Sequence, residues 1–300
     1  MSLGGMIAAV TTPFDESGEL RLERLGANLE AYNGTALGGY LILGSSGEAI
    51  ALDREEKLAV LRCASAKAGK DKLLLAGTAE ESLRATLEMS ERAAELGYAA
   101  AVVRTPHYYK KDLTQAVLRD YYRELAEAAP LPVVLYNIPP LTGVDLALET
   151  ILELAEHPRI MGLKESSGNM AKLVQLAAAR PDFAVLVGGA SSLYPSLCAG
   201  AAGAVLALAA AAPGACCAVE QAYQRGDHDL ALAGQRALVT ACRAFEPYGI
   251  AGLKAAVDAC GLYGGPPRLP LRGLAGAPRA AIEQAWAGLA VARQFAGEAK

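Results

Sequence analysis

The chain has 300 residues, of which 53% are hydrophobic and 20% are charged, so its side chains can fill a large core. Its formal net charge is -4 and its longest basic run is Lys110-Lys111, so nucleic acid is not an expected partner, because nothing would neutralise a phosphate backbone. Residues 183–219 lack charged side chains, but they are mostly Ala, Gly and Ser and contain Pro195 and Pro213, so no membrane-spanning helix is expected.

Short apolar runs recur along the chain, and each has the composition of a strand that is buried on both faces. The eight runs cover residues 6–13, 38–48, 72–79, 98–106, 131–139, 160–168, 183–192 and 202–210. Eight strands that alternate with helices around one core predict a closed (β/α)8 (TIM) barrel. An open doubly wound sheet is the alternative, but no G-x-G-x-x-G follows the first strand.

Helical patterns separate the strands. Asp53 followed by Glu56 predicts a capped helix start, and further helical spacing covers residues 80–96, 113–128 and 146–156. Strand signals end near residue 225, and three more helices are expected over residues 228–245, 249–261 and 278–296. The sequence therefore predicts a barrel over residues 1–225 and a C-terminal helical extension over residues 226–300 that packs on it.

In such a barrel the functional residues lie at the C-terminal ends of the strands. These ends are rich in hydroxyl groups and contain one lysine, Lys164, which directly follows an apolar run. Burial disfavours an ammonium, and a neutral buried lysine is a nucleophile that forms Schiff bases with carbonyl carbons. The alternative is a buried salt bridge between Lys164 and a neighbouring carboxylate such as Glu165.

Two further strand ends could supply chemistry beside Lys164. Tyr136 ends the preceding strand, where its phenol could shuttle protons or could simply be a packing residue. The turn "GSSGE", with Ser45 and Ser46, could aim hydroxyl and N–H groups at a carboxylate, or its serines could satisfy only local backbone groups. A phosphate site at Gly188-Gly189 is weakened because no basic residue is near that loop.

Metal binding is not expected, because His107, His157 and His228 are far apart and show no H-x-H or H-E-x-x-H spacing. The cysteines lack C-x-x-C spacing and are expected to be reduced. The pair Cys216-Cys217 lies on a helical pattern and is expected to fill core space. Residues 1–20 lack the basic and apolar regions of a secretory signal, so the sequence predicts a cytoplasmic protein.

Five motifs, in chain order, resemble one family. They are "TTPF" at 11–14, "GSSGE" at 44–48, "TPHYY" at 105–109, "YNIPPLTG" at 136–143 and "GLKESSG" at 162–168. Together they resemble the pyruvate-handling class I aldolases that include dihydrodipicolinate synthase and N-acetylneuraminate lyase, and the resemblance covers nearly the whole chain. It implies a (β/α)8 barrel with C-terminal helices, a homotetramer built as a dimer of dimers, and no metal or organic cofactor.

The resemblance also implies roles for single residues. Lys164 would form the Schiff base, Tyr136 would shuttle protons, and Ser45 would link to this relay. Ser46 would hold the carboxylate of a pyruvate-like substrate, and Tyr108 would extend to the site of an adjacent subunit. Three more positions are expected to line the substrate site: Ser166, Gly188 and Val205.

Departures from the family pattern indicate the subtype. Leu141 stands where dihydrodipicolinate synthases place an arginine that binds a second carboxylate, which argues against that activity. The sequence around these motifs resembles that of the 4-hydroxy-2-oxoglutarate aldolases most. Ala210 replaces a common asparagine, and Arg104 stands at a usually apolar position. Arg104 is expected either to meet the distal end of the substrate or to form a salt bridge at the barrel rim.

The predicted reaction is cleavage of a 4-hydroxy-2-oxo acid into pyruvate and an aldehyde such as glyoxylate. The enzyme alternatives are the related synthase, the neuraminate lyase, or a 2-keto-3-deoxy sugar-acid aldolase or dehydratase on the same barrel. The non-enzyme alternative is a protein that binds a 2-oxo acid without forming an adduct.

Overall fold

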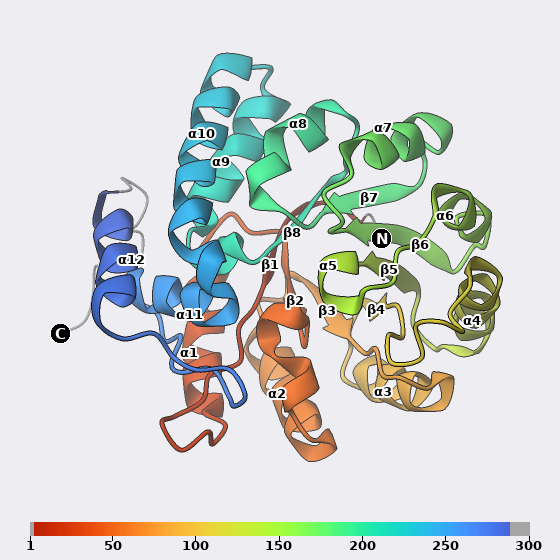
Figure 1. Cartoon of the computed structure of the whole chain (residues 1–300), viewed down its shortest axis with the longest axis horizontal. Helices are drawn as coiled ribbons and strands as arrows, with labels where there is room; N and C mark the ends of the chain where they lie inside the picture. The colour runs from red at the N-terminus through yellow and green to blue at the C-terminus, as the bar shows by residue number, and fades with distance from the viewer. Residues whose placement is uncertain (1–2, 289–300) are drawn as a thin grey trace.

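The computed structural model describes residues 3–288, and its centre is a closed barrel of eight parallel strands in sequence order (Figure 1). The predicted barrel is therefore confirmed. The strands are β1 (Gly5–Ala9), β2 (Gly39–Ile42), β3 (Leu73–Gly77), β4 (Ala100–Arg104), β5 (Val133–Asn137), β6 (Ile160–Glu165), β7 (Ala184–Val187) and β8 (Gly203–Leu206). Seven of them lie inside their apolar runs, and β1 begins one residue before its run of residues 6–13. β8 pairs with β1 to close the ring.

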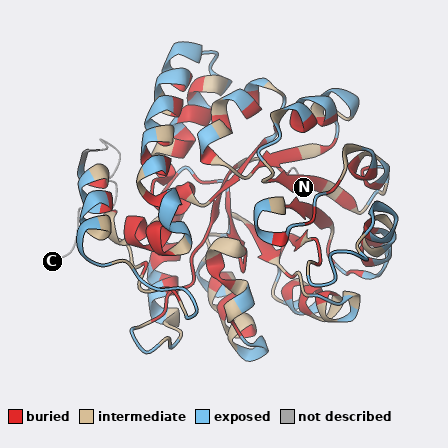
Figure 2. Cartoon of the chain, viewed as in Figure 1, coloured by how far each residue is buried: buried red, intermediate tan, exposed pale blue. Residues whose placement is uncertain are grey.

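Side chains alternate between the two faces of each strand, and both faces are buried. Ile7, Val134 and Leu186 belong to a small cluster that fills the barrel interior. Their neighbours in sequence, such as Ala8 and Leu135, belong to a larger cluster between the strands and the surrounding helices. Figure 2 shows this as a buried centre with exposed outer helix faces. Burial on both faces explains why the strands read as continuous apolar runs.

Helices surround the strands, as Figure 1 shows. They are α1 (Leu22–Asn33), α2 (Arg54–Lys67), α3 (Leu83–Glu95), α4 (Gln115–Ala128), α5 (Pro139–Thr142), α6 (Leu148–Leu154), α7 (Met170–Ala179), α8 (Leu193–Cys198) and α9 (Pro213–Gln224). The predicted start of α2 is confirmed, because Asp53 and Glu56 form a reciprocal capping box. Helix α3 begins later than its periodicity suggests, because Ser82 caps it by accepting the Ala85 N–H.

The C-terminal part forms α10 (His228–Phe245), α11 (Gly249–Ala259) and α12 (Gly276–Gly288). Helix α10 has the predicted bounds, and α12 starts within two residues of the predicted helix, whose end at 289–296 lies outside the described residues. In Figure 1 these helices lie to one side of the barrel, next to α9 and α1. The division of the chain at residue 225 stays a prediction.

The uncharged segment 183–219 forms β7, α8, β8 and the first half of α9. Cys216 and Cys217 are buried on α9, as expected for core side chains. Within residues 3–288, none of the helices combines the length and the apolar character that crossing a bilayer requires.

Replacement of Asp227 by alanine should lower the free energy of unfolding by about 1 kcal/mol. The Asp227 carboxylate accepts the Leu230 N–H 3.0 Å away and so caps α10, whose first N–H groups otherwise lack partners. Urea unfolding measures the loss. The control Asp227→Asn keeps an acceptor oxygen and should lose less; equal unfolding midpoints for wild type and Asp227→Ala would contradict this capping role.

Candidate active site

The strand register brings Tyr136 and Lys164 side by side. Tyr136 on β5 pairs with Lys164 on β6, and Lys164 pairs in turn with Leu186 on β7. Tyr136 and Leu186 belong to the interior cluster, so Lys164 also points into the barrel. Its ammonium nitrogen lies 4.1 Å from the centroid of the Tyr136 ring, and the two residues are only 4% and 5% exposed. A buried amine and a phenol thus share one end of the barrel.

Lys164 differs from the other buried lysines in its partners. Lys172 on α7 donates to Asp145 at 2.7 Å, and Lys254 on α11 donates to Glu48 at 2.6 Å. The sequence patterns placed both of these lysines among polar neighbours and did not reveal their burial. Within residues 3–288 no hydrogen bond or ion pair to Lys164 occurs, and its side-chain nitrogen lies over the ring face of Tyr136.

Glu165 does not pair with Lys164, because consecutive residues of a strand face opposite sides. Its carboxylate accepts the Asn137 side-chain amide at 3.0 Å and the Ser167 N–H at 2.6 Å, and lies 4.0 Å from the Lys172 nitrogen. Asn137 also donates to Asp145 at 2.8 Å. This outer network ties the ends of β5 and β6 to α7. It fixes the two strand ends that carry Tyr136 and Lys164.

The "GSSGE" segment is a tight turn, with a 3-10 helix at Ser45–Gly47 and Glu48 in the left-handed region. The Ser45 hydroxyl lies 3.5 Å from the Tyr136 hydroxyl, so the expected link between these residues is present as a long hydrogen bond. Ser46 follows it and is half-buried. The Thr12 hydroxyl donates to the Gly47 carbonyl at 2.6 Å and holds this turn against the segment after β1.

Gly188 and Ser166 lie in direct contact at the ends of β7 and β6. A Cβ atom on Gly188 would collide with the Ser166 side chain, so only glycine fits there. The Gly188 N–H donates to the Glu165 carbonyl at 2.8 Å. Val205 on β8 is 1% exposed and belongs to the same interior cluster as Tyr136. These positions border the barrel end that holds Lys164, and their contact with substrate stays a prediction.

Tyr108 lies outside the group formed by Lys164, Tyr136 and Ser45. It is 75% exposed, packs edge-on against Tyr109 with 5.0 Å between ring centroids, and contacts none of those three residues within the described chain.

Leu141 on α5 is 65% exposed, whereas Ala210 is fully buried. Neither Leu141 nor Ala210 is a polar ligand for a substrate.

Arg104 forms the salt bridge that was one of its two expected roles. It ends β4 next to Tyr136 in the register, and its Nη1 donates to Glu81 Oε1 at 3.0 Å and lies 2.9 Å from His107 Nδ1. Burial opposes ionisation of Glu81, but hydrogen bonds from the His107 and Tyr108 N–H groups and from Arg104 lower its pKa. Sequence reasoning missed Glu81, because its partners lie 23 to 27 residues further along the chain.

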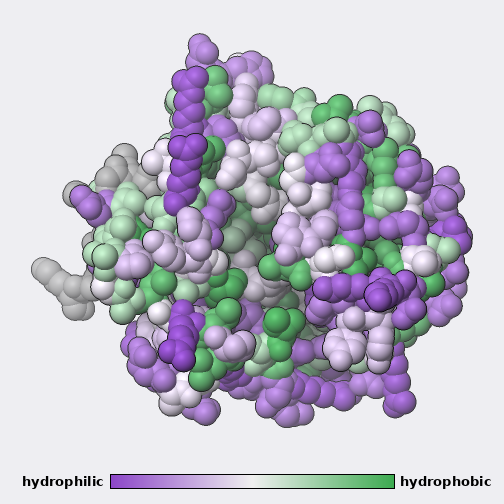
Figure 3. All heavy atoms as spheres, viewed as in Figure 1, coloured by the Kyte–Doolittle hydropathy of each residue, from purple (hydrophilic) through white to green (hydrophobic). Residues whose placement is uncertain are grey.

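Among residues 3–288, two buried hydroxyls near these strand ends have no hydrogen-bond partner. They belong to Thr11, after β1, and Thr105, after β4. Figure 3 shows mainly pale and green residues over the middle of the molecule on this side, with strongly purple residues mostly toward its outer edge. No cluster of three or more His, Cys, Asp or Glu side chains within residues 3–288 is arranged to hold a metal ion.

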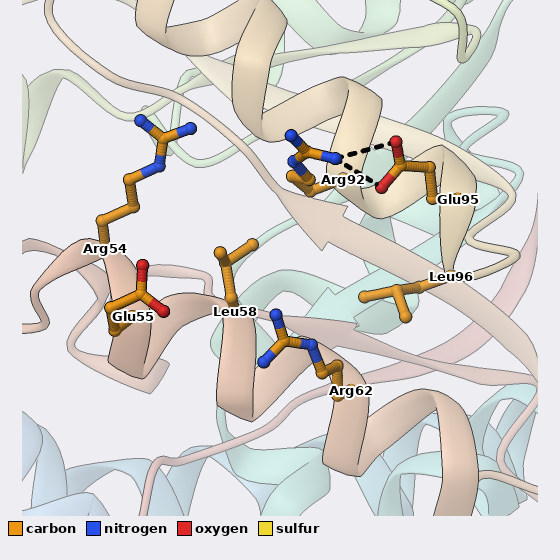
Figure 4. A pocket seen from close by; sticks show the side chains of 7 residues that line it. All are labelled: Arg54, Glu55, Leu58, Arg62, Arg92, Glu95 and Leu96. Atoms are coloured by element: carbon orange, nitrogen blue, oxygen red, sulfur yellow. Dashed lines mark hydrogen bonds and ion pairs between the residues drawn. The ribbon is translucent and has the colours of Figure 1, made fainter.

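A separate cleft of about 410 Å³ lies between α2 and α3 on the outside of the barrel (Figure 4). Arg54, Arg62 and Arg92 line it together with Leu58 and acidic side chains of the same two helices. Arg92 is paired with Glu95 in this cleft. Because no strand end contributes to it, the cleft is distinct from the Lys164 site.

A closed (β/α)8 barrel with a buried lysine beside a tyrosine at its strand ends has the layout of a carbonyl-handling barrel enzyme. Residues 2–286 match the model of the Dihydrodipicolinate synthetase family, and the chain belongs to that family. Its members and named relatives are lyases and aldolases, and this protein is likewise a carbon–carbon lyase.

Two curated relatives show the range of the family. The chain is 38% identical over 269 residues to a 4-hydroxy-tetrahydrodipicolinate synthase of Exiguobacterium sp., covering 89% of this chain and 91% of that protein. It is 32% identical over 295 residues to an L-threo-3-deoxy-hexylosonate aldolase of Hypocrea jecorina, covering 93% and 94%.

Among solved structures, the chain is similar to YagE, a prophage protein of the dihydrodipicolinic acid synthase family from E. coli K12, in complex with pyruvate. The TM-score is 0.91 at 28% identity, over 97% of this chain and all of that one. A mannosamine complex of CdNal from Clostridium difficile has a TM-score of 0.90 at 21% identity, which shows the fold.

Replacement of Glu165 by alanine should lower the free energy of unfolding by about 2 kcal/mol, because buried donors of Asn137 and Ser167 would lose a charged acceptor. Urea unfolding measures the change. The matched control is Glu153→Ala, which removes an exposed carboxylate paired with Arg119 and should change stability by less than about 0.5 kcal/mol. Equal losses in the two variants would contradict the buried role of Glu165.

Proposed function

We propose that the protein is a Schiff-base-forming aldolase that cleaves a 4-hydroxy-2-oxo acid, such as 4-hydroxy-2-oxoglutarate, into pyruvate and an aldehyde such as glyoxylate. The observation that carries the proposal is a buried lysine, 4.1 Å from the ring of Tyr136, that pairs with no carboxylate in the described part of the chain. No carboxylate within residues 3–288 holds this amine in a salt bridge, and the neutral amine is the form that attacks a carbonyl carbon.

The first half of the reaction forms the Schiff base. The substrate carboxylate binds at the Ser45-Ser46 turn, which would place the C2 ketone beside Lys164. The neutral Lys164 amine adds to C2, and the Tyr136 phenol gives its proton to the departing hydroxyl, so that water leaves and a protonated imine and the Tyr136 phenolate remain. The imine nitrogen then draws electrons from the bond that is to break.

The second half cleaves the carbon–carbon bond. Tyr136, as phenolate, takes the proton of the C4 hydroxyl, the C4 oxygen becomes a carbonyl, and the C3–C4 bonding electrons form an enamine on C3. The aldehyde leaves and Tyr136 gives the proton that it took to C3. Water then hydrolyses the imine and returns a proton to Tyr136, which releases pyruvate and free Lys164. The hydroxyl of Ser45, 3.5 Å from that of Tyr136, is close enough to pass the proton onward after a small adjustment.

Treatment of the protein with pyruvate and borohydride should add one reduced pyruvyl group at Lys164, because borohydride reduces the imine to a stable amine. Peptide mass spectrometry locates the adduct. The variant Lys164→Ala should lose both adduct and turnover, whereas the control Lys111→Ala, on the loop after β4, should keep both. An adduct at another lysine, or no adduct in the wild type, would contradict the proposal.

A second candidate substrate is a 3-deoxy-2-oxo sugar acid, which the similarity to the L-threo-3-deoxy-hexylosonate aldolase favours. The synthase activity of the Exiguobacterium relative is disfavoured here, because Leu141 provides no cationic partner for a second carboxylate. A screen of 4-hydroxy-2-oxo acids and deoxy sugar acids for release of pyruvate separates the candidates. Release of a 2-oxo acid semialdehyde instead of pyruvate would indicate a dehydratase.

Arg104 is the proposed partner for the distal carboxylate of 4-hydroxy-2-oxoglutarate. Its Nη1 is used by Glu81, Thr105 and His107, while Nε and Nη2 make no hydrogen bond within residues 3–288. Its strand position, beside Tyr136 and two strands from Lys164, is on the same end of the barrel. One arginine can therefore hold its loop and still offer two donors to an anion.

The variant Arg104→Ala should raise the KM for 4-hydroxy-2-oxoglutarate at least tenfold, because a carboxylate would lose a charged donor. The KM for pyruvate in the reverse reaction should change less than about threefold, since pyruvate has no distal carboxylate. Steady-state kinetics with both substrates test this. Equal changes in the two KM values would assign Arg104 a purely structural role.

We also propose a homotetramer in which Tyr108 completes the site of a neighbouring subunit. Tyr108 and Tyr109 are exposed, together with Ile50 and Leu141, on the segments that follow β2, β4 and β5. Exposed apolar residues at the strand ends suit contact with a second copy. The free cysteines support the proposed cytoplasmic location.

Mixing of two inactive variants tests the shared site. Lys164→Ala and Tyr108→Phe homo-oligomers should each be nearly inactive, but subunit exchange between them should restore roughly a quarter of the wild-type activity. Recovery occurs because a mixed pair contains one site with an intact Lys164 and an intact partner tyrosine. Sedimentation verifies exchange, and no recovery after verified exchange would place Tyr108 in the site of its own subunit.

A further inference from the structure

Lys254 on α11 is fully buried and makes three directed contacts. Its ammonium donates to Glu48 Oε1 at 2.6 Å and to the Pro266 carbonyl at 2.8 Å, and it lies 4.4 Å from the centroid of the Phe14 ring. An ammonium has three donors, and these contacts occupy all of them. Lys254 is therefore fixed in position, and it fixes the groups that accept its hydrogen bonds.

Glu48 is the last residue of the turn that carries Ser45 and Ser46. Its backbone N–H donates to the Ser45 carbonyl at 3.1 Å. Its φ is +52°, a backbone conformation that residues other than glycine rarely adopt and that surrounding contacts must maintain. Its second carboxylate oxygen accepts the Arg268 N–H at 2.9 Å. Both oxygens of Glu48 thus point to the C-terminal part of the chain, more than 200 residues away.

Arg268 holds the segment that follows this turn. Its guanidinium donates to both oxygens of Glu56 at 2.6 Å and to the Ala51 carbonyl at 2.9 Å. It also lies 4.4 Å from the Phe14 ring centroid, so both cations contact one buried ring. The segment from Glu48 to the start of α2 is therefore bonded to the C-terminal part at each end.

A buried ion pair is a weak source of stability, because the cost of removing two charges from water offsets their attraction. Burial lowers the pKa of Lys254, and the interaction with Glu48 counteracts this effect. An apolar pair could fill the same space at a lower desolvation cost. The ion pair instead fixes a position, because it holds the Glu48 carboxylate, and with it the left-handed backbone of Glu48, in one place.

We propose that Lys254 is a positioning residue, which acts through Glu48 to hold the Ser45–Gly47 turn in the shape that binds the carboxylate of the substrate. The ligand in this proposal rests on the proposed aldolase function, whereas the mechanical link between α11 and the turn does not. Lys254 itself does not touch the substrate. The C-terminal helices thereby take part in substrate binding without lining the site.

The variant Lys254→Met keeps the length of the side chain and removes its donors. Amide hydrogen exchange, read by mass spectrometry on the full-length protein, should become at least tenfold faster in peptides covering residues 44–52. The barrel strands should exchange as in the wild type. The KM for a 4-hydroxy-2-oxo acid should rise roughly tenfold while kcat changes less than about threefold, because Lys164 and Tyr136 stay in place.

The matched control is Arg279→Met, which removes a C-terminal cation paired with Asp258 and Glu283 that does not contact the turn. It should leave both exchange at 44–52 and KM unchanged. If Lys254→Met does not fold, the double variant Glu48→Gln with Lys254→Met removes both buried charges and should show the same fast exchange.

Unchanged exchange at 44–52 in the folded Lys254 variant, single or double, would overturn the proposal, and so would equal changes in the Arg279 control. These outcomes do not depend on catalysis. If wild-type protein forms no pyruvate adduct, the aldolase proposal fails, yet the exchange data still decide whether α11 holds the turn.

Discussion

The alternation of side chains along a parallel strand is the constraint on which this site depends. Lys164 and Glu165 are adjacent in sequence and opposite in charge, and in solution they would attract each other. The pleat of β6 turns one into the barrel and the other toward the helices, where Asn137, Ser167 and Lys172 contact the carboxylate. The barrel thus keeps a buried amine apart from the nearest acid in the chain.

Closure of the barrel is the second constraint on the positions of Tyr136 and Lys164. Because β5 and β6 are paired in register, Tyr136 must lie beside Lys164, and because eight strands close, the interior cluster fills the space beneath them. The outer network of Asn137, Glu165 and Lys172 then fixes the strand ends from behind. Lys164 and Tyr136 thus face the barrel interior, and the network that supports their strand ends faces the helices.

The sequence revealed features that rest on local chemistry. The eight apolar runs, the capping box at Asp53 and the strand-end position of Lys164 follow from patterns a few residues long. It did not reveal the burial of Lys254, Glu81 as the partner in the salt bridge of Arg104, or the Ser82 cap that overrides the helical periodicity before it. The first two depend on partners that only the folded chain brings together, and the roles of the site residues remain predictions.

The bond between Glu48 and Lys254 joins residues that are 206 positions apart, and this has a consequence for biosynthesis. A ribosome adds about 5–20 residues per second, so the nascent "GSSGE" segment waits on the order of 10–40 seconds for its counter-ion to be made. The eight strands are complete earlier, at Leu206. A nascent chain can therefore close its barrel while the Ser45–Gly47 turn is still unanchored, and Glu48 meets its counter-ion only after α11 has emerged.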